Sequence, residues 1–231
     1  MSQVIERPPF SAVEPVTEVL HGVSITDTYR WLEDQDSPRI RAWIEAYDDF
    51  LWAADWLLKT GRTSPGKLAI LWGSNSGLLV GAALTQRPDL FPAAVCMVPM
   101  LDMLRYHLFD SAHVWKEEFG TVDHPDDFAV LAKYSPYHQV RNGVGYPATM
   151  IVSGDADRNC NPLHARKMTA RLQAANVSEH LIFLDYSVFR GHSPTLPLSE
   201  RIEALTDRLA FLCNQLQLLS EGEASSCRFS C

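Results

Sequence analysis

A serine, an aspartate and a histidine each follow a separate apolar segment of this chain. Ser74, Asp157 and His192 occur in that order, and each stands just after a run that reads as a buried strand. A serine hydroxyl becomes a nucleophile when a histidine takes its proton, and a carboxylate holds that histidine in the required tautomer. The three positions therefore predict nucleophilic catalysis of acyl transfer.

The serine lies in a run of small residues, Gly73-Ser74-Asn75-Ser76-Gly77, between a strand pattern and a helical pattern. A strand-to-helix turn that presents a nucleophile is sharp and strained, so its flanking residues must be small. In such a turn the backbone N–H of the next residue, Asn75, faces the oxyanion. The alternative is a simple β-α turn, which could bind a phosphate at the helix N-terminus.

The acid and the histidine also have non-catalytic interpretations. Asp155 and Asp157 could cap the following helix or face solvent, and a histidine in a loop is usually a surface residue. However, the order serine, acid, histidine, with each residue after a strand, is the order found in α/β hydrolases. Their joint occurrence favours catalysis.

Short apolar runs alternate with helical patterns from Lys67 onward, which is typical of β-α units around a parallel sheet. We expect a long crossover at 100–146 to form a wall or lid over the site. The expected strands are 67–72, 93–98, 148–153 and 181–186, and the expected helices are 75–87, 162–175 and 199–217. We therefore expect an α/β fold, with an α/β-hydrolase-type parallel sheet and flanking helices.

The N-terminal part has a different pattern. Residues 1–35 are rich in Pro, Thr, Val and acidic groups, which predicts an extended arm, and a helix should begin at Ser37-Pro38 and end at Gly61. The expected domains are an arm and helix at 1–46, a partial catalytic domain at 47–219 and a polar tail at 220–231.

Composition limits the partners. The net charge of −8 and the isoelectric point near 5.4 argue against nucleic acid and anionic lipid. No apolar run approaches the roughly 18 residues of a membrane span, and no leader pattern is present, so we expect a cytoplasmic protein.

Five cysteines without such a leader favour reduced thiols. Cys227 and Cys231 supply only two ligands, which makes a zinc site in the tail a weak alternative.

The motifs resemble those of the prolyl oligopeptidase family over most of the chain. Gly73-Ser74-Asn75-Ser76-Gly77-Leu78-Leu79-Val80 is similar to the GGSNGGLLV elbow of that family. Further matches follow in family order: Tyr29-Arg30-Trp31-Leu32-Glu33-Asp34 in the arm, then Gln86-Arg87-Pro88-Asp89-Leu90-Phe91, Asp102-Met103-Leu104, His113-Val114-Trp115, Tyr134-Ser135-Pro136, Gly154-Asp155-Ala156-Asp157 and Pro162-Leu163-His164.

The resemblance implies serine-type cleavage of short peptides after proline, through an acyl-enzyme and without a cofactor or metal. It assigns the acid to Asp157 rather than Asp155. It also implies that Trp115 stacks on the substrate proline, with Phe119 and Cys160 at neighbouring pocket positions. Asn159 occupies the place of a substrate-binding arginine, and Arg158 stands one residue earlier.

Several features depart from the family pattern. We expect the β-propeller and the first strands of the catalytic domain to be absent, and with them the tyrosine that is the second oxyanion donor. The fold would be truncated to its C-terminal half, and its exposed sheet edge could form a homo-oligomer. Trp72 and Ser76 replace glycines of the elbow. Three hypotheses remain: a weakened peptidase, an inactive remnant or interaction module, and a small esterase with the same triad.

Overall fold

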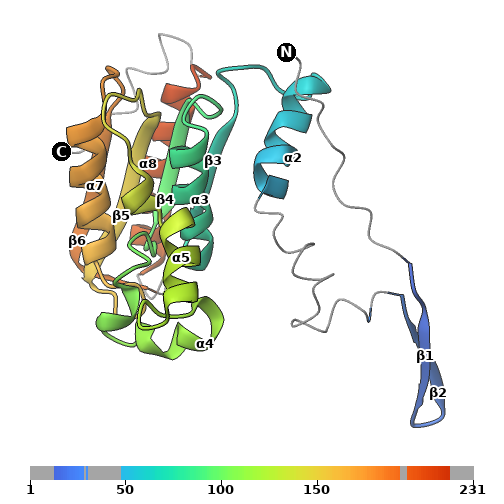
Figure 1. Ribbon diagram of the computed structural model, residues 1–231. Coiled ribbons are helices and arrows are strands. Elements are labelled where there is room, and N and C mark those ends of the chain that lie inside the picture. Colours follow the sequence, from blue (N-terminus) through green and yellow to red (C-terminus); the bar gives the residue numbers. More distant parts are fainter. Residues whose placement is uncertain (1–12, 29, 31–47, 193–196, 219–231) are drawn as a thin grey trace. The chain divides into compact units, whose positions relative to one another are not determined.

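The computed structural model describes residues 13–28, 30, 48–192 and 197–218. The chain divides into two compact units, Met1–Leu57 and Leu58–Cys231 (Figure 1). The predicted helix start at Ser37 and the polar tail at 220–231 lie outside the described residues.

A β-hairpin forms the first described part of the N-terminal unit. Strands β1 (Val16–Leu20) and β2 (Val23–Asp27) pair antiparallel. They are joined by His21 and Gly22, whose φ values of 51° and 83° are both positive, as a tight two-residue turn requires. The sequence predicts an extended arm over residues 1–35 and does not predict this hairpin.

Helix α2 (Asp48–Lys59) follows, and Gly61 lies just beyond its end with a φ of 68°. The Gly61 N–H donates to the Leu58 carbonyl at 3.2 Å, which closes the last turn. Glycine reaches this left-handed conformation at low cost, which explains why the predicted helix ends at this residue.

The C-terminal unit is built on a four-stranded parallel sheet with strand order β3-β4-β5-β6. All four predicted strands are present, and β5 and β6 continue beyond the predicted ends. Their bounds are β3 (Ala69–Gly73), β4 (Ala93–Met97), β5 (Ala148–Ala156) and β6 (Ile182–Gly191). The predicted α/β fold class is thus confirmed.

Helices cover both faces of this sheet. In Figure 1, α3 (Asn75–Gln86) and α7 (Leu163–Ala175) lie on one face, and α8 (Leu198–Gln215) lies on the other. Alternate strand residues point to α8, because side chains alternate along a strand. The core under α8 contains Ala93, Val95, Ala148, Met150, Val152 and Phe211, all buried.

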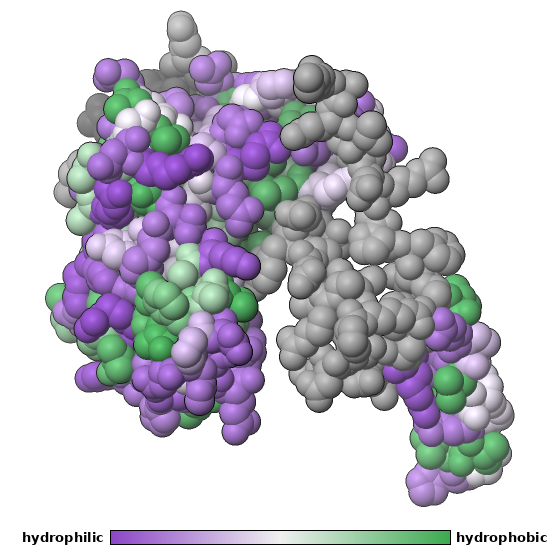
Figure 2. Space-filling model, in the orientation of Figure 1, coloured by the Kyte–Doolittle hydropathy of each residue, from purple (hydrophilic) through white to green (hydrophobic). Residues whose placement is uncertain are grey.

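The crossover at 100–146 is mostly helical. Its elements are the 3-10 helices η2 (Tyr106–Leu108) and η3 (Ala112–Trp115), followed by α4 (Lys116–Phe119), α5 (Pro125–Tyr134) and α6 (Pro136–Gln139). Phe128 and Val130 of α5 are exposed, and Figure 2 shows apolar side chains over this helix amid hydrophilic ones.

No helix among the described residues is long and apolar enough to cross a membrane.

Candidate active site

Ser74 occupies a sharp turn between β3 and α3. Its φ of 57° and ψ of −130° lie outside the regions that a serine normally adopts. The turn is held by two backbone hydrogen bonds: the Ser74 N–H donates to Met97 O at 2.9 Å, and the Gly77 N–H donates to Ser74 O at 3.0 Å. The surrounding structure therefore fixes a strained nucleophile position.

The turn requires glycine at positions 73 and 77, because neighbouring atoms lie too close to leave room for a Cβ. A Cβ at position 73 would lie 2.8 Å from the Met97 carbonyl oxygen, and one at position 77 would lie 2.9 Å from Pro99 Cβ. Trp72 is 60% exposed, so its large side chain avoids this crowded region. The turn can therefore hold a tryptophan at position 72, where the family elbow has a glycine.

The structure brings the serine, histidine and acid together in a continuous hydrogen-bonded chain. Ser74 Oγ lies 2.8 Å from His192 Nε2, and His192 Nδ1 lies 3.1 Å from both carboxylate oxygens of Asp157. With a proton on Nδ1 facing Asp157, Nε2 is free to accept the serine proton. This is the arrangement that a general base requires.

Asp157 is fully buried, and its Oδ1 accepts the N–H groups of Asn159 and Cys160 at 2.9 Å each. These bonds fix the carboxylate toward the histidine. Asp155, by contrast, is half exposed and contacts Arg166 and the Tyr186 hydroxyl. The geometry selects Asp157 as the residue that faces His192.

Asn75 is the first residue of α3. The first N–H groups of a helix have no partner within it, and the Asn75 N–H has none elsewhere among the described residues. It follows the nucleophile directly, so it is free to serve as an oxyanion donor. The Asn75 side chain reaches Glu118 of α4 at 3.5 Å.

Trp115, Phe119 and Cys160 lie in one apolar cluster. The Tyr106 ring packs edge-on against Phe119 at 5.8 Å, and its hydroxyl donates to Gly120 O at 2.6 Å. Burial, and to a smaller extent the nearby Asp157 carboxylate, raise the pKa of the Cys160 thiol to about 12. The thiol is therefore neutral, and the three predicted pocket residues form an apolar wall.

Arg158 and Asn159 are placed differently. The Arg158 side chain is 79% exposed and pairs with Asp110 at 3.2 Å, while Asn159 is exposed and uses its backbone N–H to bind Asp157. Arg158 is thus engaged by Asp110. The structure brings neither side chain into the apolar wall.

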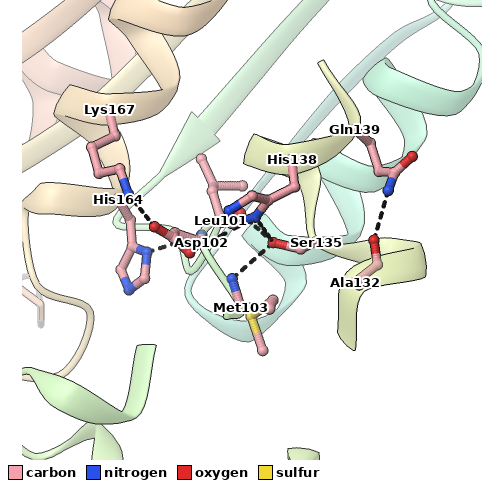
Figure 3. Close-up of polar contacts among 9 residues, drawn as sticks. All are labelled: Leu101, Asp102, Met103, Ala132, Ser135, His138, Gln139, His164 and Lys167. Carbon is pink, nitrogen blue, oxygen red and sulfur yellow. Dashed lines mark hydrogen bonds and ion pairs between the residues drawn. The ribbon is translucent and has the colours of Figure 1, made fainter. Parts of the chain in front are cut away.

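A buried polar network, which the sequence analysis does not predict, lies around Asp102 (Figure 3). Asp102 is fully buried and forms an ion pair with Lys167 of α7. The Asp102 N–H donates to His164 Nδ1 at 3.1 Å. Burial lowers the pKa of His164 to about 4, so this imidazole is neutral near pH 7. The network ties the segment after β4 to α7.

The same network holds the crossover helices. The Ser135 hydroxyl accepts the N–H of Met103 at 3.0 Å and lies 2.8 Å from His138 Nδ1. His138 in turn lies 3.9 Å from Asp102. Helix α7 and helix α6 are therefore both linked to one buried carboxylate. In the sequence, Asp102, Ser135 and His164 occur in three separate short motifs, and nothing there indicates that they interact.

A parallel sheet with a serine turn, an acid and a histidine at its carboxyl end defines the α/β-hydrolase class. Residues 43–218 match the prolyl oligopeptidase family, and residues 8–53 match the N-terminal β-propeller domain of prolyl oligopeptidases. The chain therefore belongs to the prolyl oligopeptidase family of serine peptidases.

Individual relatives agree with this assignment. A prolyl endopeptidase of Dictyostelium discoideum is 43% identical over 143 residues, 58% of this chain and 19% of the relative. An uncharacterized peptidase, RP174, of Rickettsia prowazekii is 34% identical over 225 residues, 94% of this chain and 30% of the relative. A solved prolyl endopeptidase structure has a TM-score of 0.75 at 39% identity, covering 85% of this chain and 30% of its own.

The chain thus spans between about a fifth and a third of the length of these relatives. Within the described residues, no group of three or more His, Cys, Asp or Glu side chains could hold a metal ion.

Proposed function

We propose that this chain is a serine-type peptidase that cleaves short peptides after proline through an acyl-enzyme. The observation that carries the proposal is the hydrogen-bonded chain from Ser74 through His192 to the buried Asp157. Membership of a peptidase family supports a peptide substrate.

In the proposed mechanism, His192 Nε2 takes the Ser74 proton as Oγ attacks the carbonyl carbon of the proline residue. Asp157 stabilises the imidazolium that forms. His192 then gives this proton to the leaving amine. Water, activated by the same histidine, cleaves the ester and frees the serine.

The apolar wall of Trp115, Phe119 and Cys160 suits a proline side chain. A flat indole offers a large apolar surface to a rigid ring, and the neutral Cys160 thiol adds no charge. Substituting Trp115 with alanine should therefore raise KM for proline peptides more than for peptides with alanine at the same position.

The expected rate is low, because Asn75 is the single oxyanion donor that we assign in this chain. Loss of one donor typically slows acyl transfer by about a hundred- to a thousand-fold. An active-site fluorophosphonate tests the triad without depending on turnover. We expect labelling of the full chain and none of Ser74→Ala.

Two further substrates then separate the remaining hypotheses. A proline-linked chromogenic peptide should be cleaved faster, relative to spontaneous hydrolysis, than a p-nitrophenyl ester. Preference for the ester would indicate a small esterase. Absence of labelling in a chain with a cooperative thermal transition would indicate an inactive remnant or interaction module.

A further inference from the structure

A cavity of about 470 Å³ opens beside the triad, on the face of the sheet that α8 covers. Ser74 and His192 line one part of it. Its wall is apolar where Leu198, Ile202 and Leu205 of α8 contribute. Trp115, Phe119 and Cys160 do not line it, so it is separate from the proposed proline pocket.

Three arginines, Arg190, Arg201 and Arg208, also line this cavity. Arg190 Nη1 pairs with the Asp185 carboxylate at 3.1 Å and donates to Asp185 O at 2.9 Å. Among the described residues, Arg208 and Arg201 have no carboxylate in an ion pair. The described lining thus contains three arginines and no carboxylate, while Asp185 and Asp207 lie near Arg208 and offset part of its charge.

Two of these guanidinium groups have unsatisfied donors. The Nε atoms of Arg190 and Arg208 are buried and find no hydrogen-bond partner in the part of the chain that the structure describes. A buried donor without a partner is costly. Burial, and then the neighbouring charge of Arg190, lower the pKa of Arg208. An anion beside the two guanidinium groups would reduce their mutual repulsion.

We propose that this cavity binds a carboxylate of the substrate, on the leaving-group side of the scissile bond. The inference rests on the proposed peptidase function. The proline pocket takes the acyl side of the substrate, which leaves the second cavity at the triad for the other side. Carboxylates are the anions that peptides carry, and the guanidinium fork matches their two oxygens.

The carboxylate could come from the peptide C-terminus or from an acidic side chain. Both present the same group to the arginines. A charge-assisted hydrogen bond of this kind typically corresponds to a difference of about tenfold or more in affinity.

Calorimetric binding to the full-length Ser74→Ala chain tests the proposal without any catalysis. The probes are two peptides with the same sequence, two residues beyond proline, ending in a free acid or in an amide. We expect the acid to bind about tenfold more tightly. A second pair of peptide amides, with glutamate or glutamine as the last residue, tests the side-chain source.

Arg208→Gln in the Ser74→Ala background should reduce the acid preference to about twofold or less. Arg87→Gln is the matched control, because it removes one positive charge at the C-terminal end of α3, away from the cavity, and should preserve the preference. Arg208→Lys, which keeps the charge but loses the fork, should be intermediate. If Arg208→Gln lacks a cooperative thermal transition, Arg201→Gln takes its place.

Equal binding of all four peptides, no measurable binding, or a preference that survives Arg208→Gln and Arg201→Gln would overturn the proposal. Its failure is distinguishable from failure of the peptidase function. Fluorophosphonate labelling of Ser74 with equal peptide binding rejects only the carboxylate site. A clear acid preference without labelling supports carboxylate binding and rejects the catalytic proposal.

Discussion

Nδ1 of His192 lies equally far, 3.1 Å, from the two carboxylate oxygens of Asp157. One of these oxygens already accepts two backbone N–H groups, from Asn159 and Cys160. The carboxylate is therefore fixed by its own loop before it orients the imidazole.

Asp157→Asn should slow fluorophosphonate labelling of Ser74 by about 10⁴-fold, because an amide cannot stabilise the imidazolium and favours the wrong tautomer. The thermal transition should remain cooperative, since asparagine retains an oxygen for the backbone N–H groups. Asp155→Asn is the control and should label at nearly the normal rate. Comparable labelling of both variants would exclude Asp157 as the acid.

Ser74→Gly should be more stable than Ser74→Ala by about 1 kcal/mol. Both variants remove the hydroxyl, but at a φ of 57° alanine keeps a strain that glycine relieves. Such strain is worth about 1–3 kcal/mol, and part is offset by the larger entropy of glycine in the unfolded chain. Urea unfolding measures the difference. Equal stability would mean that the turn relaxes when the serine is lost.

Lys167→Met should destabilise the fold by about 3 kcal/mol, because it leaves the buried Asp102 carboxylate without its cation. This value is the low end of the range for a buried pair, since Lys167 remains one third exposed. The double variant Asp102→Asn with Lys167→Met should recover at least half of the loss. Chemical unfolding of Lys167→Met, Asp102→Asn and the double variant gives the coupling energy. A double variant as unstable as Lys167→Met would contradict the prediction.

His164 should make the fold sensitive to acid. Its pKa is lowered from 6.5 to about 4 by burial, so above pH 6.5 the imidazole is neutral in both folded and unfolded chains. Below pH 6.5 the unfolded chain binds a proton that the folded chain does not, so stability falls as the pH drops toward 4. At pH 5 the loss should be about 2 kcal/mol relative to pH 7.

Urea unfolding at pH 7 and pH 5 measures this loss. His164→Asn, which retains an acceptor for the Asp102 N–H, should show a pH dependence smaller by that amount. If both proteins lose the same stability, other groups cause the acid sensitivity.

The sheet could be predicted because each strand is a short apolar run between turn residues. The prediction ended β6 too early at residue 186. Beyond it, Ser187 and Arg190 interrupt the apolar run, although the backbone continues to pair with β5 as far as Gly191. Backbone pairing does not need apolar side chains, so an edge strand can continue beyond the apolar run that predicts it.

The proximity of Ser74, Asp157 and His192 could be predicted because local patterns identify the carboxyl ends of strands. The Asp102 network could not, since its bonds join residues 62 and 65 positions apart. Nothing in a single sequence pairs such positions. The hairpin was missed because its turn is His21-Gly22, and histidine is a weak signal for a residue with positive φ.

The strand order has a consequence for the triad. Ser74 follows β3 and His192 follows β6, which are the two outermost strands of the sheet. Three strand spacings of about 4.8 Å separate them. The 2.8 Å contact between their side chains therefore bridges the whole width of the sheet. A small change in sheet twist or curvature would break it, so reactivity toward a fluorophosphonate should report the shape of the entire sheet and disappear before the chain unfolds.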